Sequence, residues 1–282
     1  PIAKGLPEKA DLYIANRGDN LIALMPRARQ TVFWVHNPAN YLLKWRYLSK
    51  LWRYNPIIVF IGDYHSTTYP SWAPGRERVT IPYGISEEFR SVEGAKGAPL
   101  PRAIFTSNPL RSLSWLLDLW TLRIQPFVPN SELHLFSGSA TYGEVGARKG
   151  MEISIVLDKA KKLGNKGVLI RDPVSKLELI EEFRKSRVML YRGDINETFC
   201  LALGEAQAAG VPAVVQKYGS VVERVKDGLT GALTESDDAF VEAAIKLLTD
   251  DKCWLKAHQN AQAFQRDWGW SQAAEAFERL LP

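Results

Sequence analysis

Residues 191–212, YRGDINETFCLALGEAQAAGVP, decide how the rest of the chain is interpreted. A short apolar run at residues 188–191 leads into a polar turn, and residues 201–209 are mostly strong helix formers. Gly210 then stands where a helix-ending C′ glycine is expected. The pattern predicts a strand, a loop and a helix, with the helix N-terminus at the carboxyl end of the strand. This is where α/β folds hold anionic ligands.

Two carboxylates in this stretch are candidate site residues. Glu197 falls in the loop, and Glu205 is expected about two turns into the helix. At about 1.5 Å per residue, roughly 12 Å of rise separates them, which is close to the length of a nucleotide sugar. The alternative is that Glu205 is a solvated helix residue and Glu197 an ordinary loop charge.

The pattern E-x7-E followed by A-x-A-A-G-V-P resembles the retaining glycosyltransferases of family 4, which have the GT-B fold. The resemblance implies two Rossmann-like α/β domains whose parallel sheets face a cleft. It implies that Glu205 holds the donor ribose and that Glu197 lies beside the donor sugar and the leaving phosphate. The backbone amides implied to face the sugar diphosphate are those of Thr198, Phe199, Cys200 and Leu201.

Two further segments resemble the same family. WVHNP places His36 just past a strand end, where family members have a histidine beside the donor sugar, and IPYGISEEF resembles I-P-N-G-[IV]-D…F. Tyr83 replaces the customary Asn, so the turn chemistry is expected to differ there. For His36 the alternative is a structural histidine at a strand end. His134 and His258 have less claim to a site, and His65 stays open.

Arg111 is the candidate ligand of the donor diphosphate. It precedes a predicted helix in S-N-P-L-R-S-L-S-W-L-L, which resembles S-x-x-R-G-L-x-x-L-L of a glycosyltransferase subgroup, and residues 128–138 continue that match to Gly138. A guanidinium can donate two parallel hydrogen bonds to phosphate oxygens. Ser112 stands where the subgroup has Gly, so the loop is expected to have a different shape. The alternative is that Arg111 is a surface charge.

Four short apolar runs predict buried parallel strands in an unusually short N-terminal domain: residues 11–15, 31–36, 56–62 and 78–82. Either residues precede Pro1 or this domain is naturally reduced. We predict a domain at residues 1–92, a Gly-, Ala- and Pro-rich linker at 93–101, and a nucleotide-sugar-binding domain at 102–265. By the family resemblance, residues 266–282 form a helix that crosses back to the first domain. Ser175 and Glu178 predict a capping box.

Composition narrows the class of protein. The chain has 282 residues, 46% of them hydrophobic and 24% charged, which is typical of a globular protein with room for two cores. Its two cysteines lack metal-ligand spacing, so neither a disulfide framework nor a zinc site is expected, and a reducing cytoplasm fits. No apolar run is long enough to span a membrane. The net charge of +5 is scattered among apolar residues, which argues against nucleic-acid binding.

Residues 41–54 predict one amphipathic helix with an apolar stripe between basic residues. Packing on its own sheet is the first interpretation, and peripheral contact with an anionic membrane is the second. The side chains expected to meet an acceptor are aromatic and basic: Trp45, Arg46, Tyr47, Trp52, Arg53 and Tyr54.

From these features we expect a retaining, metal-independent glycosyltransferase without a cofactor, in which Glu197 and His36 orient the donor sugar. Its partners would be a nucleotide-diphosphate sugar and a saccharide or lipid-linked acceptor, in the cytoplasm or at the inner face of the membrane. No D-x-D pair is present to hold a divalent cation on the donor. Two alternatives stay open. One is a non-catalytic nucleotide-sugar-binding subunit or a partner-dependent glycosyltransferase fragment, and the other is a sugar-nucleotide hydrolase or epimerase on a similar fold.

Overall fold

The structure is a computed structural model that describes residues 8–24, 27–137 and 149–282. It divides into two compact units, and each is described by itself. The first comprises Pro1–Gly84, Asn196–Phe199 and Trp268–Pro282, and the second Ile85–Ile195 and Cys200–Asp267. These units describe packing alone, and the domain boundaries given above stay a prediction. Gly138 and residues 1–7 lie outside the described residues.

The first unit contains a parallel sheet with the order β1-β2-β3-β4 among its described residues. Its strands are β1 (Ala10–Asn16), β2 (Ala28–Trp34), β3 (Ile57–Phe60) and β4 (Glu77–Thr80). They correspond to the four predicted strands. Its helical segments are η1 (Asp19–Ala23), η2 (Ala39–Leu43), α1 (Trp45–Tyr54), α2 (Asp63–Thr67) and α12 (Trp270–Glu278).

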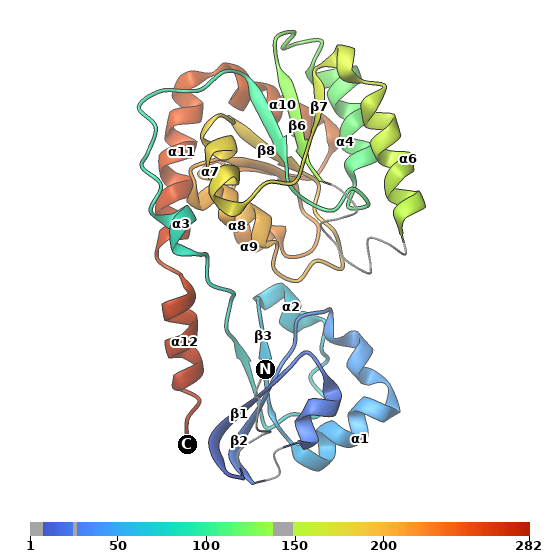
Figure 1. The fold of residues 1–282 in the computed structure, drawn as a ribbon, viewed down its shortest axis with the longest axis vertical. Coiled ribbons are helices and arrows are strands. Elements are labelled where there is room, and N and C mark those ends of the chain that lie inside the picture. The colour runs from blue at the N-terminus through green and yellow to red at the C-terminus, as the bar shows by residue number, and fades with distance from the viewer. Residues whose placement is uncertain (1–7, 25–26, 138–148) are drawn as a thin grey trace. The chain divides into compact units, whose positions relative to one another are not determined.

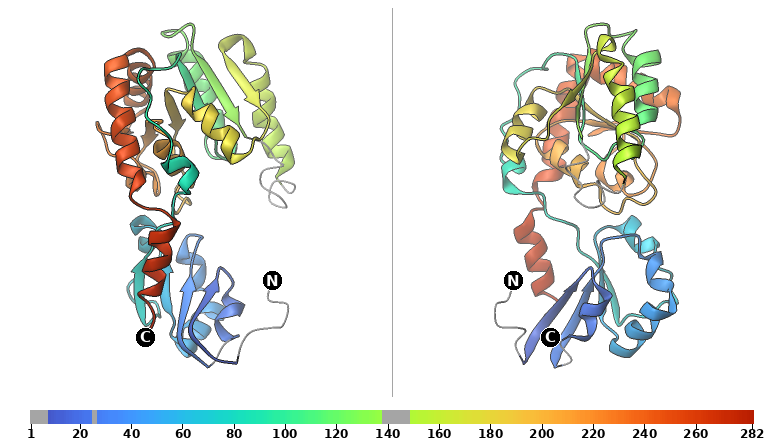
Figure 2. Two further views of the ribbon diagram at one scale, coloured as in Figure 1. Left: turned by 60° about the vertical axis from the view of Figure 1, so that its left-hand side comes forward. Right: turned by 45° about the vertical axis from the view of Figure 1, so that its right-hand side comes forward.

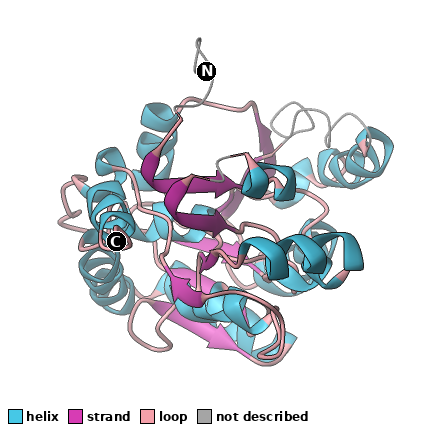
Figure 3. Cartoon of the chain, turned by 90° about the horizontal axis from the view of Figure 1, so that it is seen from below, coloured by secondary structure: helices cyan, strands magenta, loops and turns pink. Residues whose placement is uncertain are grey.

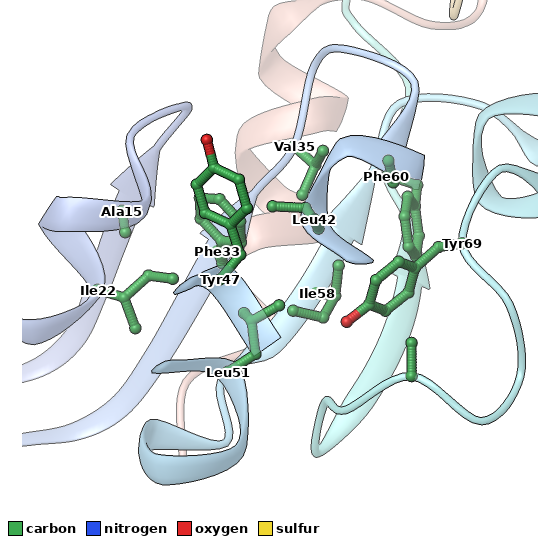
Figure 4. Close-up of a cluster of buried hydrophobic side chains, with 12 residues drawn as sticks. Ala15, Ile22, Phe33, Val35, Leu42, Tyr47, Leu51, Ile58, Phe60 and Tyr69 are labelled. Carbon is green, nitrogen blue, oxygen red and sulfur yellow. The ribbon is translucent and has the colours of Figure 1, made fainter. Parts of the chain in front are cut away.

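Side chains of β2 and β3 are buried on both faces of this sheet, which explains their continuous apolar runs. On one face, a core cluster drawn in Figure 4 brings together Phe33, Ile58 and Phe60 with residues of η2 and α1, such as Leu42 and Leu51. On the other face, a second cluster includes the following residues of the strands and of α12: Val32, Ile57, Val59, Ala273 and Phe277. Burying each of these larger side chains is worth about 1.5 to 3 kcal/mol.

The prediction of one helix over residues 41–54 is wrong. Lys44 has extended backbone angles, φ −73° and ψ 140°, and separates the 3-10 turn η2 from α1. The two pieces bury different side chains, Leu42 in η2 and Leu51 in α1. The apolar stripe therefore does not come from a single helix, although both pieces pack on the same core.

The second unit contains a larger parallel sheet, with the order β10-β9-β8-β5-β6-β7 in the part of the chain that is described. Its strands are β5 (Arg102–Phe105), β6 (Glu132–Phe136), β7 (Val168–Arg171), β8 (Val188–Tyr191), β9 (Ala213–Gln216) and β10 (Gly231–Thr234). Figure 3 distinguishes the strands of the chain from the helices around them.

Helices cover both faces of this second sheet, with α4 and α6 on one side and α7, α8 and α11 on the other (Figures 1 and 2). Its helical segments are α3 (Glu87–Arg90), α4 (Leu113–Leu119), the π-helical turn η3 (Trp120–Ile124), α6 (Gly150–Lys161), the 3-10 turn η5 (Gly164–Lys166), α7 (Lys176–Arg184), α8 (Leu201–Ala208), α9 (Val221–Arg224), α10 (Asp237–Thr249) and α11 (Asp251–Arg266). The predicted capping box is confirmed at the start of α7, where Ser175 and Glu178 hydrogen-bond each other's backbone amides.

The stretch predicted as a linker packs on the second unit. The amide of Ala95 donates to Nε2 of His258 over 2.9 Å, and Nε of Arg187 donates to the carbonyl of Pro99 over 2.6 Å. None of the described helices is long and apolar enough to cross a membrane.

Candidate active site

The strand, loop and helix predicted from residues 188–209 are present. The strand β8 is fully buried, and α8 begins at Leu201 and ends at Ala208. Gly210 follows with φ +91°, the left-handed conformation of a helix-ending glycine. A Cβ at this position would lie 2.2 Å from the ring of His258, so a larger residue would not fit.

Glu205 lies nearer the start of its helix than predicted. It is the fifth residue of α8, so it stands at the beginning of the second turn. Thr198 and Phe199 are not helical. The rise of 12 Å between Glu197 and Glu205 assumed a continuous helix and is therefore wrong. The helix begins at Leu201, as the residue types predict, directly after Cys200, whose φ of +59° is a left-handed conformation that a regular helix does not contain.

The Glu205 carboxylate is buried and paired. Only 9% of the residue is exposed, and its Oε1 accepts from Nζ of Lys176 over 2.9 Å. Burial raises the pKa of Glu205, and the ammonium of Lys176 opposes that shift. Lys176 is the first residue of α7, and its side chain is 60% exposed, so the partner can be displaced into solvent. The solvated-helix alternative for Glu205 is therefore wrong.

Arg111 belongs to the turn before α4. Its amide donates to the carbonyl of Asn108 over 2.8 Å, and Ser112 follows with φ +64°. That left-handed conformation is one that glycine adopts without steric cost. Ser112 therefore has the backbone conformation that the subgroup's glycine favours. The φ angle of Ser112 does not show the expected difference in loop shape. Since β5 and β8 are parallel neighbours, the loops after them leave the same edge of the sheet.

The segment Asn196–Phe199 packs in the first unit together with His36. The hydroxyl of Thr198 donates to the backbone carbonyl of His36 over 2.6 Å. Glu197, Thr198 and Phe199 are each at least nine-tenths buried. The structure therefore brings Glu197 and His36 into one compact unit, and it places Arg111 and Glu205 in the other.

His36 is held through both ring nitrogens. Its Nδ1 contacts the hydroxyl of Tyr83, and its Nε2 lies 2.5 Å from Oδ1 of Asn16. Burial, followed by the charges of Arg17 and His65, lowers the pKa of His36 to about 4. The imidazole is therefore neutral near pH 7, and it can donate or accept a hydrogen bond without contributing a charge.

The remaining histidines have structural partners. His65 is fully buried, accepts from the amide of Ile61 and donates to the carbonyl of Asn37. His258 donates to the carbonyl of Gly210. The open question about His65 is thereby answered in favour of a structural role.

Two residues near the site were missed from the sequence. Lys176 lies 29 positions before Glu205, and no local pattern links them. Tyr83 was noted only as a departure from the family's Asn, and that departure was the available signal. Gly84 beside it allows a close approach, since a Cβ there would lie 2.2 Å from the amide nitrogen of Trp270.

A cavity of about 510 Å³ lies between β10, α10 and α11 in the second unit. Its walls include Leu233, Ala243 and Cys253, and none of the predicted site residues. We do not assign it to the donor. Across residues 8–24, 27–137 and 149–282, no group of three or more His, Cys, Asp or Glu side chains could hold a metal ion.

Comparison with known proteins gives this geometry a family context. Residues 152–264 match the family model of glycosyl transferases group 1. That region contains α7, β8 and α8, and hence Lys176, Glu197 and Glu205. The match does not test family 4 or the E-x7-E motif.

One curated relative is the D-inositol 3-phosphate glycosyltransferase of Xylanimonas cellulosilytica, which is 33% identical over 111 residues. The match covers 39% of this chain and 26% of the relative, so it spans about a quarter of that protein's length.

Two solved structures resemble nearly the whole chain. Sucrose-phosphate synthase from Thermosynechococcus elongatus has a TM-score of 0.73 at 15% identity, over 96% of this chain and 72% of its own. The Anabaena protein HepE, solved in complex with UDP-glucose, has a TM-score of 0.72 at 15% identity, over 96% of this chain and 78% of its own. These likenesses confirm the predicted GT-B class of α/β fold with two parallel sheets.

Proposed function

We propose that this protein transfers a glycosyl group from a nucleotide-diphosphate sugar to a hydroxyl acceptor. The observation that carries the proposal is the buried Glu205 in the second turn of α8, within the region that matches glycosyl transferases group 1. A buried carboxylate whose partner Lys176 is exposed suits a ligand that brings its own hydroxyl donors. A ribose does so with its 2′ and 3′ hydroxyls.

The diphosphate would bind where a helix and a cation supply positive potential. The first-turn amides of α8 have no partner within the helix and present the positive end of its dipole. This turn begins at Leu201, directly after the left-handed Cys200. Arg111, from the loop after the neighbouring strand β5, would add a bidentate contact to phosphate oxygens.

The chemistry proposed is transfer with retention of the anomeric configuration. The bond between the anomeric carbon and the diphosphate oxygen breaks, and the acceptor oxygen bonds to that carbon on the same face. The acceptor's proton passes to the departing phosphate oxygen. Fixed dipoles and Arg111 stabilise the anion that develops, so no metal is required. Glu197 and His36 would orient the sugar.

The acceptor side is proposed for the first unit, at a face of α1. Residues 1–84 hold eleven Lys and Arg against five Asp and Glu, a balance of +6, whereas the whole chain carries +5. Trp45 and Trp52 are 71% and 55% exposed and contact each other edge to face, with ring centroids 5.8 Å apart. Exposed tryptophans beside basic residues suit the interface of an anionic membrane, such as its cytoplasmic face. A lipid-linked saccharide is the acceptor that fits this surface.

The structure corrects the expected set of exposed side chains on α1. Tyr47 is 91% buried in the core cluster, and Tyr54 is partly buried and packs against that cluster. Lys50 lies 2.6 Å from Oδ2 of Asp19 and also donates to Asn20. The face available to an acceptor or membrane is therefore formed by Lys44, Trp45, Arg46, Trp52 and Arg53, which are all exposed.

Release of nucleoside diphosphate tests the proposed reaction. The protein is incubated with UDP-, GDP- or ADP-glucose and lipid-linked saccharides in the presence of EDTA, and products are separated by chromatography. We expect one nucleoside diphosphate to be released together with a glycosylated product whose anomeric configuration matches the donor. Donor binding without any release would favour the non-catalytic alternative, and loss of activity with EDTA would contradict metal independence.

A further inference from the structure

Three polar side chains of the first unit, Tyr83, His36 and Asn16, form one hydrogen-bonded chain at the carboxyl edge of its sheet, and the charge of Arg17 acts on two of them. Arg17 and Asn16 stand at the end of β1, His36 lies two residues after β2, and Tyr83 lies three residues after β4. The hydroxyl of Tyr83 contacts Nδ1 of His36. Nε2 of His36 meets Oδ1 of Asn16 at 2.5 Å.

The direction of this chain follows from Asn16. Its Oδ1 is an amide oxygen, which only accepts, so Nε2 of His36 must donate to it. A neutral imidazole that carries its proton on Nε2 accepts at Nδ1, so the hydroxyl of Tyr83 donates to Nδ1. Both bonds point from Tyr83 towards Asn16.

The partners of the two ring nitrogens of His36 differ in how firmly they are held. Tyr83 packs against aromatic rings of the same unit, with centroids 5.0 Å from Phe199, 5.8 Å from Trp34 and 5.9 Å from Trp270. Asn16 is exposed. The bond to Tyr83 is thus fixed by packing, and the bond to Asn16 is the one that a ligand oxygen can replace.

We propose that Tyr83 is a positioning residue that fixes His36 in the tautomer with its proton on Nε2, directed at a hydroxyl oxygen of the donor sugar. The ligand part of this role rests on the proposed glycosyl transfer, whereas the tautomer does not. Tyr83 would thereby hold the ring of His36 by direct contact of its hydroxyl with Nδ1. Tyr83, which stands in the I-P-Y-G segment where the family has Asn, would therefore be part of the site.

The experiment reads the tautomer of His36 directly. Long-range ¹H–¹⁵N correlation spectra of the ¹⁵N-labelled protein at pH 7 show which ring nitrogen of each histidine is protonated. The chain has four histidines. Two serve as internal references: His65 donates from Nε2 to a carbonyl, and His258 donates from Nδ1. The His36 signals are assigned by their loss in His36→Gln.

We expect His36 to be protonated on Nε2 in the wild type and to become a mixture of both tautomers in Tyr83→Phe, which keeps the packed ring but lacks the hydroxyl. Tyr69→Phe is the matched control, because Tyr69 donates to Pro74 and not to His36. His65 and His258 keep their tautomers in both variants, which shows that each variant is folded. A wild-type His36 protonated on Nδ1, or a single unchanged tautomer in Tyr83→Phe, would overturn the proposal.

A second measurement separates this proposal from the proposed function. If the protein transfers a sugar, Tyr83→Phe should lower kcat at least several-fold and leave the affinity for free nucleoside diphosphate unchanged. Unchanged kcat in a protein that transfers sugar would overturn the catalytic part. If no transfer occurs at all, the proposed function fails, and the spectra still decide the tautomer.

Discussion

Nζ of Lys176 lies 2.9 Å from Oε1 of Glu205, so the buried carboxylate of α8 is held by a cation that is itself 60% exposed. An ion pair with one exposed partner contributes at most about 1 kcal/mol to stability. The ammonium of Lys176 therefore balances the charge of the Glu205 carboxylate but adds little to the stability of the fold. This leaves Glu205 ready to exchange an ammonium for the hydroxyl groups of a ligand.

Glu205→Gln should weaken nucleotide binding by about 1.5 to 3 kcal/mol, the usual size of a charge-assisted hydrogen bond. The amide has nearly the same shape, so the fold should be retained. Isothermal titration calorimetry with nucleoside diphosphates measures the loss. Glu181→Gln is the control, because Glu181 is exposed and contacts Arg184 of its own helix. Equal affinities for wild type and Glu205→Gln would refute the ribose contact.

Stability should fall as the pH drops from 6.5 towards 4. Burial lowers the pKa of both His36 and His65 to about 4, so the unfolded chain takes up protons in this range while the folded chain does not. Each shift corresponds to at most about 3 kcal/mol, and for the partly exposed His36 solvent screening reduces it to about 1 kcal/mol. The contribution of the two neutral histidines to the free energy of unfolding is fully present above pH 6.5.

Urea unfolding at pH 7 and at pH 5 tests this dependence. His36→Gln should lose less stability than the wild type between the two values, by roughly 1 kcal/mol. A variant whose loss on acidification equals that of the wild type would show that His36 is not held neutral.

Ser112→Gly should stabilise the protein by about 0.5 to 1 kcal/mol, because Ser112 has φ +64° and glycine adopts that conformation without a clash of its Cβ. Ser112→Ala keeps the Cβ and should give no gain, which makes it the matched control. Both are compared by urea unfolding. A gain with Ala as large as with Gly would mean that the backbone conformation is not the cause.

Binding to anionic vesicles should depend on the exposed basic residues of α1 and on Lys44, which directly precedes it. We expect the protein to sediment with vesicles of phosphatidylserine and phosphatidylcholine at low salt and to be released as ionic strength rises, since charges are screened beyond about 10 Å at 0.1 M. Replacing Lys44, Arg46 and Arg53 together by Gln should abolish sedimentation. Lys50→Gln should not, because Lys50 is engaged with Asp19.

Failure to sediment at any salt concentration would leave a soluble acceptor as the better account. Sedimentation of the triple variant would show that another surface is responsible. Trp45→Ala with Trp52→Ala should weaken binding at every salt concentration, because the loss of apolar contact is not screened.

The sequence was sufficient for features that depend on local pattern. Continuous apolar runs predicted the parallel strands, because strands buried on both faces have no polar side. The capping box of Ser175 and the left-handed Gly210 follow from residue types at fixed spacing. These are interactions between residues a few positions apart.

Features that depend on backbone angles or on distant partners were not predictable. Nothing in the residue types shows that Lys44 is extended and divides the expected helix, or that Cys200 adopts a left-handed conformation before α8. Lys176 meets Glu205 only because α7 and α8 pack on the same face of the sheet (Figure 1). Tyr83 and His36 are 47 positions apart and meet at the edge of another sheet.

The most direct test of the central claim is a calorimetric titration of the protein with UDP-, GDP- and ADP-glucose, compared with Arg111→Lys. The account predicts saturable binding of at least one donor by the wild type. It predicts a loss for Arg111→Lys that is larger for the nucleoside diphosphate than for the nucleoside, because a lysine cannot form the two parallel hydrogen bonds of a guanidinium. Absence of binding to all three donors by the folded protein, or equal losses for nucleoside and nucleoside diphosphate, would contradict it.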